Sequence, residues 1–445
     1  MDVISETNAL TAQDPVCDAC LGRVFAELSF GLTNAVRGRS LRVAAALAAD
    51  EPYEPSENSE CWVCEGIMQK SVFDSYATRC VEAVGSVEYD TYQVGTKTPP
   101  LIEENDALLR ETADIDIDRG EAFKSAFNRE VGKRVGKITG GEVSFERPDV
   151  QFLIDPEADT VECSNHSAFV YGRYRKLERD IPQTKWPCNA CQGSGYIGQQ
   201  QCEKCDGVGL LYETSVEQLT APVVCDVMDG TETSFHGAGR EDVDARMLGT
   251  GRPFVIEVFE PRRRDINTAR LEGDINAFAE EMVEVTGLRL ATYDIVERVK
   301  ELDASKRYRA VVSFDERVDE DAFTQAVSSL ENSSIEQRTP RRVSHRRADI
   351  TRTREVYQMG GELHTPTKAV VDIHTAGGLY VKELISSDEG RTEPSLAELL
   401  EVSATVNKLD VTGVYGESVP FEKDTLFRDD RVVESPTQVS PQSSE

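Results

Sequence analysis

Three features that indicate a membrane protein, a secreted protein or a nucleotide cofactor are missing from this sequence. No apolar run approaches the ~20 residues needed to cross a bilayer, and the polar, acidic N-terminus is unlike a signal peptide. The sequence has no phosphate-binding loop, and no Gly-x-Gly-x-x-Gly fingerprint stands between a predicted strand and a helix. We therefore expect a cytoplasmic protein with no organic cofactor and no membrane contact.

Positive charge is also scarce. Lysine and arginine number 49 against 80 acidic residues, which gives a net charge of -31. In an ordinary cytosol this balance argues against a nucleic-acid partner, because phosphate binding requires a positive surface. A large excess of acidic residues is also typical of halophilic proteins, because high salt screens the repulsion between their charges. We expect a haloarchaeal origin, in which RNA binding depends on shape, stacking and base contacts.

The eleven cysteines are not spread as in a secreted disulfide framework. Eight of them form four Cys-x-x-Cys pairs, which are typical of metal sites: Cys17 and Cys20, Cys61 and Cys64, Cys188 and Cys191, and Cys202 and Cys205. The last two pairs repeat one motif, with glycine two and four places after the second cysteine, as in zinc knuckles. Because four thiolates complete a tetrahedral zinc site, we predict two structural zinc ions with no open position for catalysis.

The stretch from Gly239 to Gly249 alternates glycine, arginine and acid directly before an apolar run. Glycine suits a loop whose backbone turns tightly or lies close to a ligand, and arginine suits phosphate contacts. A carboxylate among arginines stays ionised, because a nearby cation lowers its pKa. Asp242 is therefore a candidate nucleophile or base on a nucleotide sugar. The same residues also fit a surface loop that pairs its own charges.

Gly239-Arg240-Glu241-Asp242 resembles the catalytic-aspartate motif of pseudouridine synthases. Further segments resemble, in the same order, the archaeal and eukaryotic tRNA pseudouridine synthases that act on uridines 54 and 55 of the TΨC arm. These segments are Arg147–Val150, Tyr171–Tyr174, Ile181–Pro187, Thr339–Arg347 and Gly378–Leu384. The similarity extends from about Cys17 to about Gly416, which is nearly the whole chain.

The resemblance implies an isomerase that breaks the N1–C1′ bond of uridine, rotates the base and joins C5 to C1′. Asp242 holds the position of the catalytic aspartate, and Asp244 is the alternative two residues later. Tyr308 resembles the active-site tyrosine that stacks on the target base, and Lys382 resembles the basic residue that pairs with the carboxylate. The family's apolar residue that packs against the base corresponds to Leu384.

The partner implied by the resemblance is tRNA, whose target uridine must be flipped out at a cost of a few kcal/mol. We expect Tyr380 to pack beneath the site and a set of basic residues to hold the RNA: Arg240, Arg246, Arg252, Arg341, Arg342, His345, Arg346 and Arg347. A second basic group lies on a helix predicted over 122–135, and we favour phosphate contacts for it over a solvated face: Lys124, Arg129, Lys133, Arg134 and Lys137.

The predicted fold class is α+β. The resemblance implies a zinc-containing THUMP-type RNA-binding domain over 17–180 and a catalytic domain with a mixed sheet of pseudouridine synthase type over 215–432. A linker over 181–214 carries the second zinc knuckle. Residues 1–16 form a polar lead-in, and the tail over 433–445 is expected to be disordered because it is rich in serine, proline and glutamine. A monomer without an obligate protein partner is the default expectation.

Two other classes of function fit part of the pattern. Another THUMP-type tRNA-modifying enzyme, such as a methyltransferase or a thiolation enzyme, requires a binding loop for S-adenosylmethionine or ATP, which the sequence lacks. A non-catalytic zinc-containing RNA-binding protein leaves Asp242, Tyr308 and Lys382 without a reason to converge. The cysteine repeat also resembles that of J-protein chaperones, but the chain contains no His-Pro-Asp tripeptide.

Overall fold

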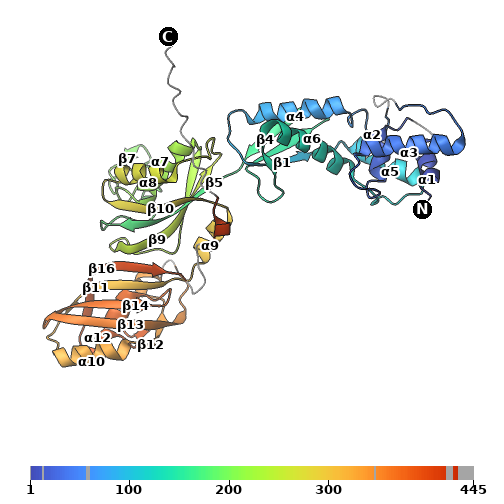
Figure 1. Cartoon of the computed structure of the whole chain (residues 1–445). Coiled ribbons are helices and arrows are strands. Elements are labelled where there is room, and N and C mark those ends of the chain that lie inside the picture. Colours follow the sequence, from blue (N-terminus) through green and yellow to red (C-terminus); the bar gives the residue numbers. More distant parts are fainter. Residues whose placement is uncertain (1, 13–14, 57–60, 345–346, 417–423, 429–445) are drawn as a thin grey trace, which may run out of the picture. The chain divides into compact units, whose positions relative to one another are not determined.

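The chain is described by a computed structural model that divides into two compact units, Met1–Ser167 and Ala168–Glu445 (Figure 1). The residues it describes are 2–12, 15–56, 61–344, 347–416 and 424–428. The expected domain boundary at residue 180 differs from this division, because the strand that begins at Ala168 belongs to the sheet of the second unit. The predicted tail over 433–445 lies outside the described residues. None of the described helices is long and apolar enough to cross a membrane.

The first part of the first unit is helical and surrounds four cysteines. Its helices are α1 (Val3–Thr11), α2 (Asp18–Val24), α3 (Asn34–Ala49) and α5 (Pro100–Thr112). Cys17 caps α2 by accepting a hydrogen bond from the backbone N–H of Cys20, and Thr33 caps α3 in the same way. Helix α2 contains Cys20 and packs against α3, which lies between the first two cysteine pairs in the chain.

The second part of the first unit is a four-stranded sheet with two helices, α4 (Lys70–Val84) and α6 (Phe123–Thr139). The strands are β1 (Thr91–Thr96), β2 (Glu142–Val143), β3 (Val150–Asp155) and β4 (Thr160–Asn165), in the order β2-β1-β3-β4. Helix α6 buries one apolar face, and its Phe127 ring packs 5.6 Å from Phe73 and 5.8 Å from Tyr76 of α4.

The second unit is built on a ten-stranded sheet in the order β10-β5-β9-β16-β11-β14-β13-β12-β15, with β8 also paired to β9. The strands on the β9 side are β5 (Ala168–Lys176), β8 (Glu232–Gly237), β9 (Arg246–Phe259) and β10 (Val283–Ala291). Those on the other side are β11 (Ser305–Phe314), β12 (Ser333–Arg338), β13 (Thr351–Thr365), β14 (Lys368–Thr375), β15 (Thr392–Glu393) and β16 (Ala404–Tyr415). Strands β9 and β16 pair in parallel over two residues, whereas the other described pairs are antiparallel. The sheet is therefore mixed.

Two groups of helices give the second unit two main cores, one on each side of the β9–β16 junction. Helices α7 (Val216–Met228) and α8 (Thr268–Phe278) cover the strands around β9, and α9 (Asp294–Glu301) contacts β8 and β9. Helices α10 (Glu320–Leu330), α11 (Val381–Ser386) and α12 (Leu396–Leu400) cover the strands from β11 to β13. This architecture and the sheet of the second unit confirm the predicted α+β class.

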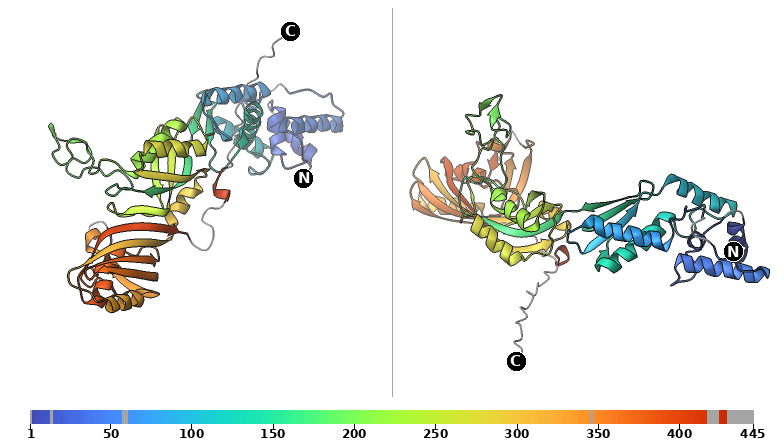
Figure 2. Two further views of the ribbon diagram at one scale, coloured as in Figure 1. Left: turned by 60° about the vertical axis from the view of Figure 1, so that its left-hand side comes forward. Right: turned by 90° about the horizontal axis from the view of Figure 1, so that it is seen from above.

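Residues 187–210, which we call the cysteine finger, stand out from the sheet of the second unit in both views of Figure 2. The finger contains the two-residue strands β6 (Tyr196–Ile197) and β7 (Gln200–Gln201). Its buried interior is a cluster of four side chains, Cys188, Cys191, Cys202 and Cys205. A module with so small an apolar interior needs a metal or a disulfide to hold its fold.

Candidate active site

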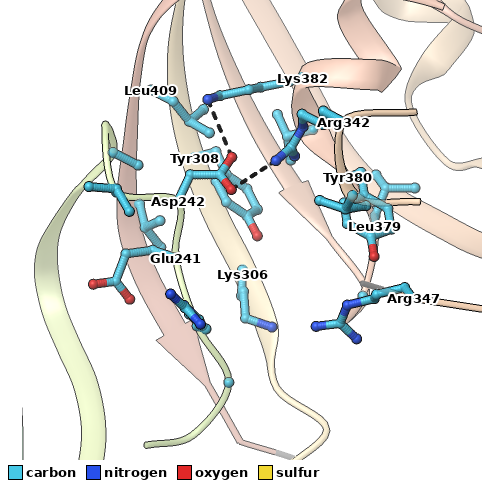
Figure 3. A pocket seen from close by; sticks show the side chains of 18 of the residues that line it. Glu241, Asp242, Lys306, Tyr308, Arg342, Arg347, Leu379, Tyr380, Lys382 and Leu409 are labelled. Atoms are coloured by element: carbon cyan, nitrogen blue, oxygen red, sulfur yellow. Dashed lines mark hydrogen bonds and ion pairs between the residues drawn. The ribbon is translucent and has the colours of Figure 1, made fainter. Parts of the chain in front are cut away.

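Asp242 lies in the loop that joins β8 to β9, and the preceding residue anchors this loop. The Glu241 carboxylate lies 2.9 Å from the Nε atom of Arg252, and both side chains are only 1% exposed. Figure 3 shows the two carboxylates on opposite sides of the loop, with Glu241 turned away from the cavity and Asp242 turned toward it. The buried ion pair therefore fixes the loop in an orientation that presents Asp242.

Buried side chains also bind the carbonyl oxygens of this loop. The donor–acceptor pairs are Arg252 to Ala238 (2.7 Å), Gln183 to Gly239 (3.0 Å), Lys176 to Asp242 (3.3 Å) and Lys176 to Val243 (3.0 Å). The Tyr174 hydroxyl donates to the Glu241 carboxylate at 2.8 Å, and burial raises the pKa of Tyr174 well above its usual value. A loop held by so many buried donors is arranged before a substrate arrives, as electrostatic catalysis requires.

Two cationic side chains contact the Asp242 carboxylate. Its Oδ1 atom accepts a hydrogen bond from Nη1 of Arg342 at 2.9 Å, and its Oδ2 atom lies 3.3 Å from Nζ of Lys382. Burial alone raises the pKa of Asp242, but the charges of Arg342 and Lys382 outweigh it and hold the pKa below its usual value. The carboxylate is therefore ionised at neutral pH, which is the state needed to attack a carbon or to accept a proton.

Arg342 is itself held by a second carboxylate. Its Nε atom donates to Oε1 of Glu383 on α11 at 2.6 Å, and the Glu383 side chain is 5% exposed. The guanidinium also lies 5.8 Å from the ring centre of Tyr380. We expected Arg342 to contact RNA, but the structure gives it two protein carboxylates. Its position beside Asp242 therefore suits fixing and ionising that carboxylate.

Asp244 shares the lysine of Asp242 but not its surroundings. Nζ of Lys382 lies 2.8 Å from Oδ2 of Asp244. The Asp244 side chain is 61% exposed, whereas that of Asp242 is 32% exposed, and only Asp242 is among the residues that line the cavity beside the loop. The geometry therefore favours Asp242 over the alternative.

The cavity beside Asp242 has a volume of about 820 Å³, which is within the range of small-molecule and cofactor sites. Tyr308 and Lys306 of β11 line it on one side and Tyr380 on another (Figure 3). Burial raises the pKa of Tyr308 to about 12, so its hydroxyl keeps its proton at neutral pH. Burial lowers the pKa of Lys306 to about 8, with a further contribution from the charge of Arg252, so Lys306 is largely charged at pH 7.

The structure brings Asp242, Tyr308 and Lys382 to one cavity, whereas two other expected site residues, Arg246 and Arg252, are paired with acids of the chain. Arg246 forms a bidentate ion pair with Asp410, in which Nη2 lies 2.8 Å from Oδ2 and Nε lies 2.9 Å from Oδ1. Arg246 does not line the cavity. Arg252 lines the cavity, with its charge paired to Glu241. Each is bound by an acid of this chain, and their contact with displaced RNA backbone stays a prediction.

The other expected contacts differ in their positions. Arg240 and Arg347 line the cavity, whereas Arg341 lies 2.5 Å from Glu389. Leu384 of α11 is fully buried in the core, so the expectation that it packs against a bound base is corrected. Leu379 and Leu409 line the cavity in its place. Arg346 and His345 lie outside the described residues.

Three cavity features were missed at the level of the sequence. In the sequence, Glu241 is only the neighbour of Asp242 in an acid-rich loop, and nothing there indicates that it is buried and paired with Arg252. Lys306 lies two residues before Tyr308 on the same strand, a spacing that places both side chains on one face. Trp186 lines the cavity and belongs to a segment that carries the family resemblance, Ile181–Pro187.

Both predicted cysteine groups converge in space. Within each group the four Sγ atoms lie within 4.8 Å of one another, and all eight side chains are buried. Three of the Sγ–Sγ distances are 3.8 Å (Cys17 to Cys64), 4.0 Å (Cys188 to Cys202) and 3.7 Å (Cys191 to Cys205). Zn–S bonds of about 2.3 Å in a tetrahedron place the sulfur atoms about 3.8 Å apart, so both groups fit zinc.

The glycines of the cysteine finger are required by its close internal packing. A Cβ atom on Gly195 would lie 2.2 Å from the carbonyl oxygen of Gly207, and one on Gly209 would lie 2.3 Å from that of Gly193. Gly195 and Gly209 also have positive φ angles of 76° and 79°. The backbone N–H groups of these two glycines donate to Sγ of Cys191 and Cys205 at 3.3 and 3.2 Å, which favours the thiolate form.

In the first unit, the predicted basic face of α6 is partly neutralised. Arg129 lies 2.9 Å from Glu121, and Arg134 lies 2.6 Å from Asp74. Lys124, Lys133 and Lys137 are exposed on the same helix. The three lysines therefore remain as the candidate phosphate contacts, whereas the two arginines are bound within the protein.

Comparison with known proteins connects both units to one family. A family model described as "Pus10, C-terminal" matches residues 169–415, and a model described as "Pus10 THUMP domain, archaeal" matches residues 76–155. A protein of Halorubrum lacusprofundi named tRNA pseudouridine synthase Pus10 is 63% identical over 429 residues, which cover 96% of this chain and 100% of the relative. A protein of the same name from Methanothrix thermoacetophila is 40% identical and covers 95% of this chain and 96% of the relative.

Proposed function

Because the chain belongs to the Pus10 family and is a tRNA pseudouridine synthase of archaeal type, we propose that it isomerises uridine 54, uridine 55 or both in the TΨC loop. In this proposal Asp242 acts on the sugar of the flipped uridine. The observation that carries it is the ionised Asp242 carboxylate, held by Arg342 and Lys382 at the wall of a cavity that Tyr308 also lines.

The proposed reaction is balanced within the substrate. The N1–C1′ bond breaks, the uracil rotates, the C5–C1′ bond forms, and the proton lost from C5 is matched by one gained at N1. Asp242 either attacks C1′ or takes a proton from C2′ to release the base. Both roles need an anionic carboxylate close to the sugar, which is the state that Arg342 and Lys382 favour.

Tyr308 is proposed to stack on the freed uracil with its hydroxyl beside C5. Its hydroxyl stays protonated near neutral pH because burial raises its pKa to about 12. A half-buried aromatic ring suits stacking on an extruded base, which otherwise loses its neighbours in the RNA. Lys306, two residues earlier on the strand, offers a positive charge to the same cavity.

The choice of uridine is tested with four unmodified tRNAs that carry tritium at C5 of uridine: the natural sequence, one with cytidine at 54, one with cytidine at 55 and one with cytidine at both positions. Isomerisation releases the C5 tritium into water, so release reports on each position separately. We expect release from the natural tRNA in molar KCl without any cofactor, and loss of release when the modified position is replaced. Full release from a tRNA with cytidine at both positions would contradict the proposed target.

Both cysteine groups are proposed to hold structural zinc. Their sulfur spacing and burial support this, and four thiolates leave no open coordination position for catalysis. We expect two zinc ions per purified chain by mass spectrometry of native protein, and one ion in Cys191→Ser. Metal-free wild-type protein that keeps its fold would contradict the proposal for both sites.

The Arg342–Asp242 pair leads to a prediction for the pH profile. The Arg342→Gln variant removes one of the two cations that hold the Asp242 carboxylate, so the pKa of Asp242 rises. Because the carboxylate must be ionised, activity then falls as the pH drops through the new pKa. We expect single-turnover rates at pH 5, relative to pH 7.5, to fall at least about fivefold in Arg342→Gln and little in wild type.

The matched control for this prediction is Arg347→Gln. Arg347 lines the same cavity, but in its variant the rate should fall at the same low pH as in wild type. A profile of Arg342→Gln parallel to that of wild type would contradict the role of Arg342 in ionising Asp242. The rate at pH 7.5 is measured in all three proteins, so that a general loss of activity is separated from a shift of the pH at which the rate falls.

The first unit is proposed to bind the same tRNA through its THUMP domain. Lys124, Lys133 and Lys137 of α6 are the candidate phosphate contacts, because they are exposed in a chain with a large excess of acid. Phosphate contacts weaken with salt, so these lysines alone do not explain binding at high ionic strength. Base stacking and apolar contacts elsewhere in the protein must then contribute.

A further inference from the structure

Hydrogen bonds and a ring contact join the two ends of the cysteine finger at its base, which we call the root. At this root the backbone N–H of Leu211 donates to the carbonyl oxygen of Trp186 at 2.9 Å, and that of Cys188 donates to Gly209 at 2.7 Å. The rings of Trp186 and Tyr212 pack edge to face with centres 5.4 Å apart. The two chain ends of the finger therefore stay together.

The root of the finger is part of the active-site wall. Trp186 lines the cavity, and the guanidinium of Arg240 lies 4.6 Å from the centre of its ring. Arg240 precedes Asp242 by two residues in the same loop. A substrate nucleotide that enters the cavity therefore places its neighbours in the chain close to the start of the finger.

The surface of the finger differs from the rest of this acidic chain. Residues 187–210 contain one lysine and two acidic residues, a net charge of -1, whereas the whole chain carries -31. Tyr196, Ile197 and Val208 are 57%, 56% and 65% exposed, and the buried interior holds cysteines alone. The finger thus presents an aromatic ring and aliphatic groups on a surface of low net charge.

We propose that the cysteine finger is a second RNA-contacting surface that binds unpaired nucleotides next to the one in the cavity, with Tyr196 stacking on a base. The occupant is the tRNA substrate, because the finger is continuous with the cavity wall through Trp186 and has a net charge of only -1. Stacking and apolar contacts also persist in concentrated salt, where phosphate contacts weaken. The inference rests on the proposed function.

The test compares wild type with the double variant Tyr196→Ala/Ile197→Ser and the control Phe278→Ala. Phe278 is 52% exposed in the same unit, at the end of α8. Zinc content is measured first, so that each variant is known to keep its finger folded. We expect the double variant to raise the Kd for unmodified tRNA and the KM by about tenfold, with kcat within about twofold of wild type, because one base stack contributes about 1–3 kcal/mol.

Salt dependence separates the finger from phosphate contacts. The slope of log Kd against log KCl concentration counts the phosphate contacts. The double variant should therefore keep the wild-type slope and lie on a parallel line, and chemical footprinting should show one or more loop bases that lose protection. An unchanged Kd, or a lower kcat with an unchanged Kd, would overturn the inference.

The inference and the proposed function fail in different ways. Wild-type protein that releases no tritium from tRNA contradicts the proposed target and leaves the binding comparison to decide on the finger. Wild-type protein that modifies the TΨC loop, with a double variant equal to it in Kd, KM and footprint, contradicts the finger alone. Binding of the finger to a protein partner instead of RNA would give this second result.

Discussion

Replacement of Asp242 by asparagine is expected to lower the single-turnover rate of pseudouridine formation by at least about 10⁴-fold. The amide keeps the shape of the side chain and removes the anion that Arg342 and Lys382 stabilise. The Kd for tRNA should stay within about threefold of wild type, because the loop is anchored by Glu241 and not by Asp242. Quench-flow measurement of tritium release and filter binding on the same protein give both values.

The matched control is Asp244→Asn. Asp244 shares Lys382 with Asp242, carries the same charge and lies two residues away, but it is more exposed and does not line the cavity. We expect its rate to stay within about tenfold of wild type. The opposite ranking, with Asp244→Asn inactive and Asp242→Asn active, would transfer the catalytic role to Asp244.

The largest effect on stability is expected at the ion pair beneath the catalytic loop. Glu241→Leu leaves Arg252 buried without its partner, with its side chain 1% exposed, and should lower the free energy of unfolding of the second unit by about 3–5 kcal/mol. The double variant Glu241→Leu/Arg252→Met should lose less than the single variant, because Arg252 is no longer buried without its carboxylate and only Lys176, 3.8 Å from Glu241, still loses one.

Tryptophan fluorescence offers a measurement specific to the second unit. The chain has two tryptophans, Trp62 in the first unit and Trp186 at the root of the cysteine finger. In a Trp62→Phe background, urea titration in molar KCl therefore reports on Trp186 alone. The control is Arg309→Met, which breaks an exposed pair with Asp372 and should cost no more than about 1 kcal/mol. Equal losses for the buried and the exposed pair would contradict the anchoring role of Glu241.

The fold class and the family could be predicted because their signals are local in the sequence. Four Cys-x-x-Cys pairs and a motif of four residues around Asp242 need no knowledge of distant contacts. The predicted helix over 122–135 agrees with α6 because its apolar residues repeat at helical spacing. The division between the two units falls before β5, not at residue 180. Nothing local in the sequence indicates this, because only the pairing of β5 with β9 and β10 assigns it to the second sheet.

The roles of the arginines could not be read in the same way. Arg246 is paired with Asp410, which is 164 positions later in the chain, and nothing local in the sequence indicates this contact. Arg252 looked like part of a basic loop, although its partner Glu241 is within that loop and both are buried. Because Arg246 and Arg252 follow a glycine-rich motif, the sequence predicts that they contact RNA. In the structure each forms an ion pair with an acid of the protein.

The proposed catalytic group also depends on long-range contacts. Asp242, Tyr308 and Lys382 come from the β8–β9 loop, from β11 and from α11, and the short parallel pairing of β9 with β16 brings these elements together. The sequence placed the three residues in one site through a resemblance, and their convergence follows from the sheet order. Their individual roles stay predictions until the variants above are measured.

The most direct measurement is carbodiimide mapping of pseudouridine on unmodified elongator tRNA after incubation in molar KCl without cofactor, with wild type and Asp242→Asn in parallel. We expect reverse transcription to stop in the TΨC loop after treatment with wild type and to read through after treatment with Asp242→Asn, although both proteins bind the tRNA. A stop of equal strength with both proteins would contradict the role of Asp242, and no stop with folded, tRNA-binding wild type would contradict the proposed target.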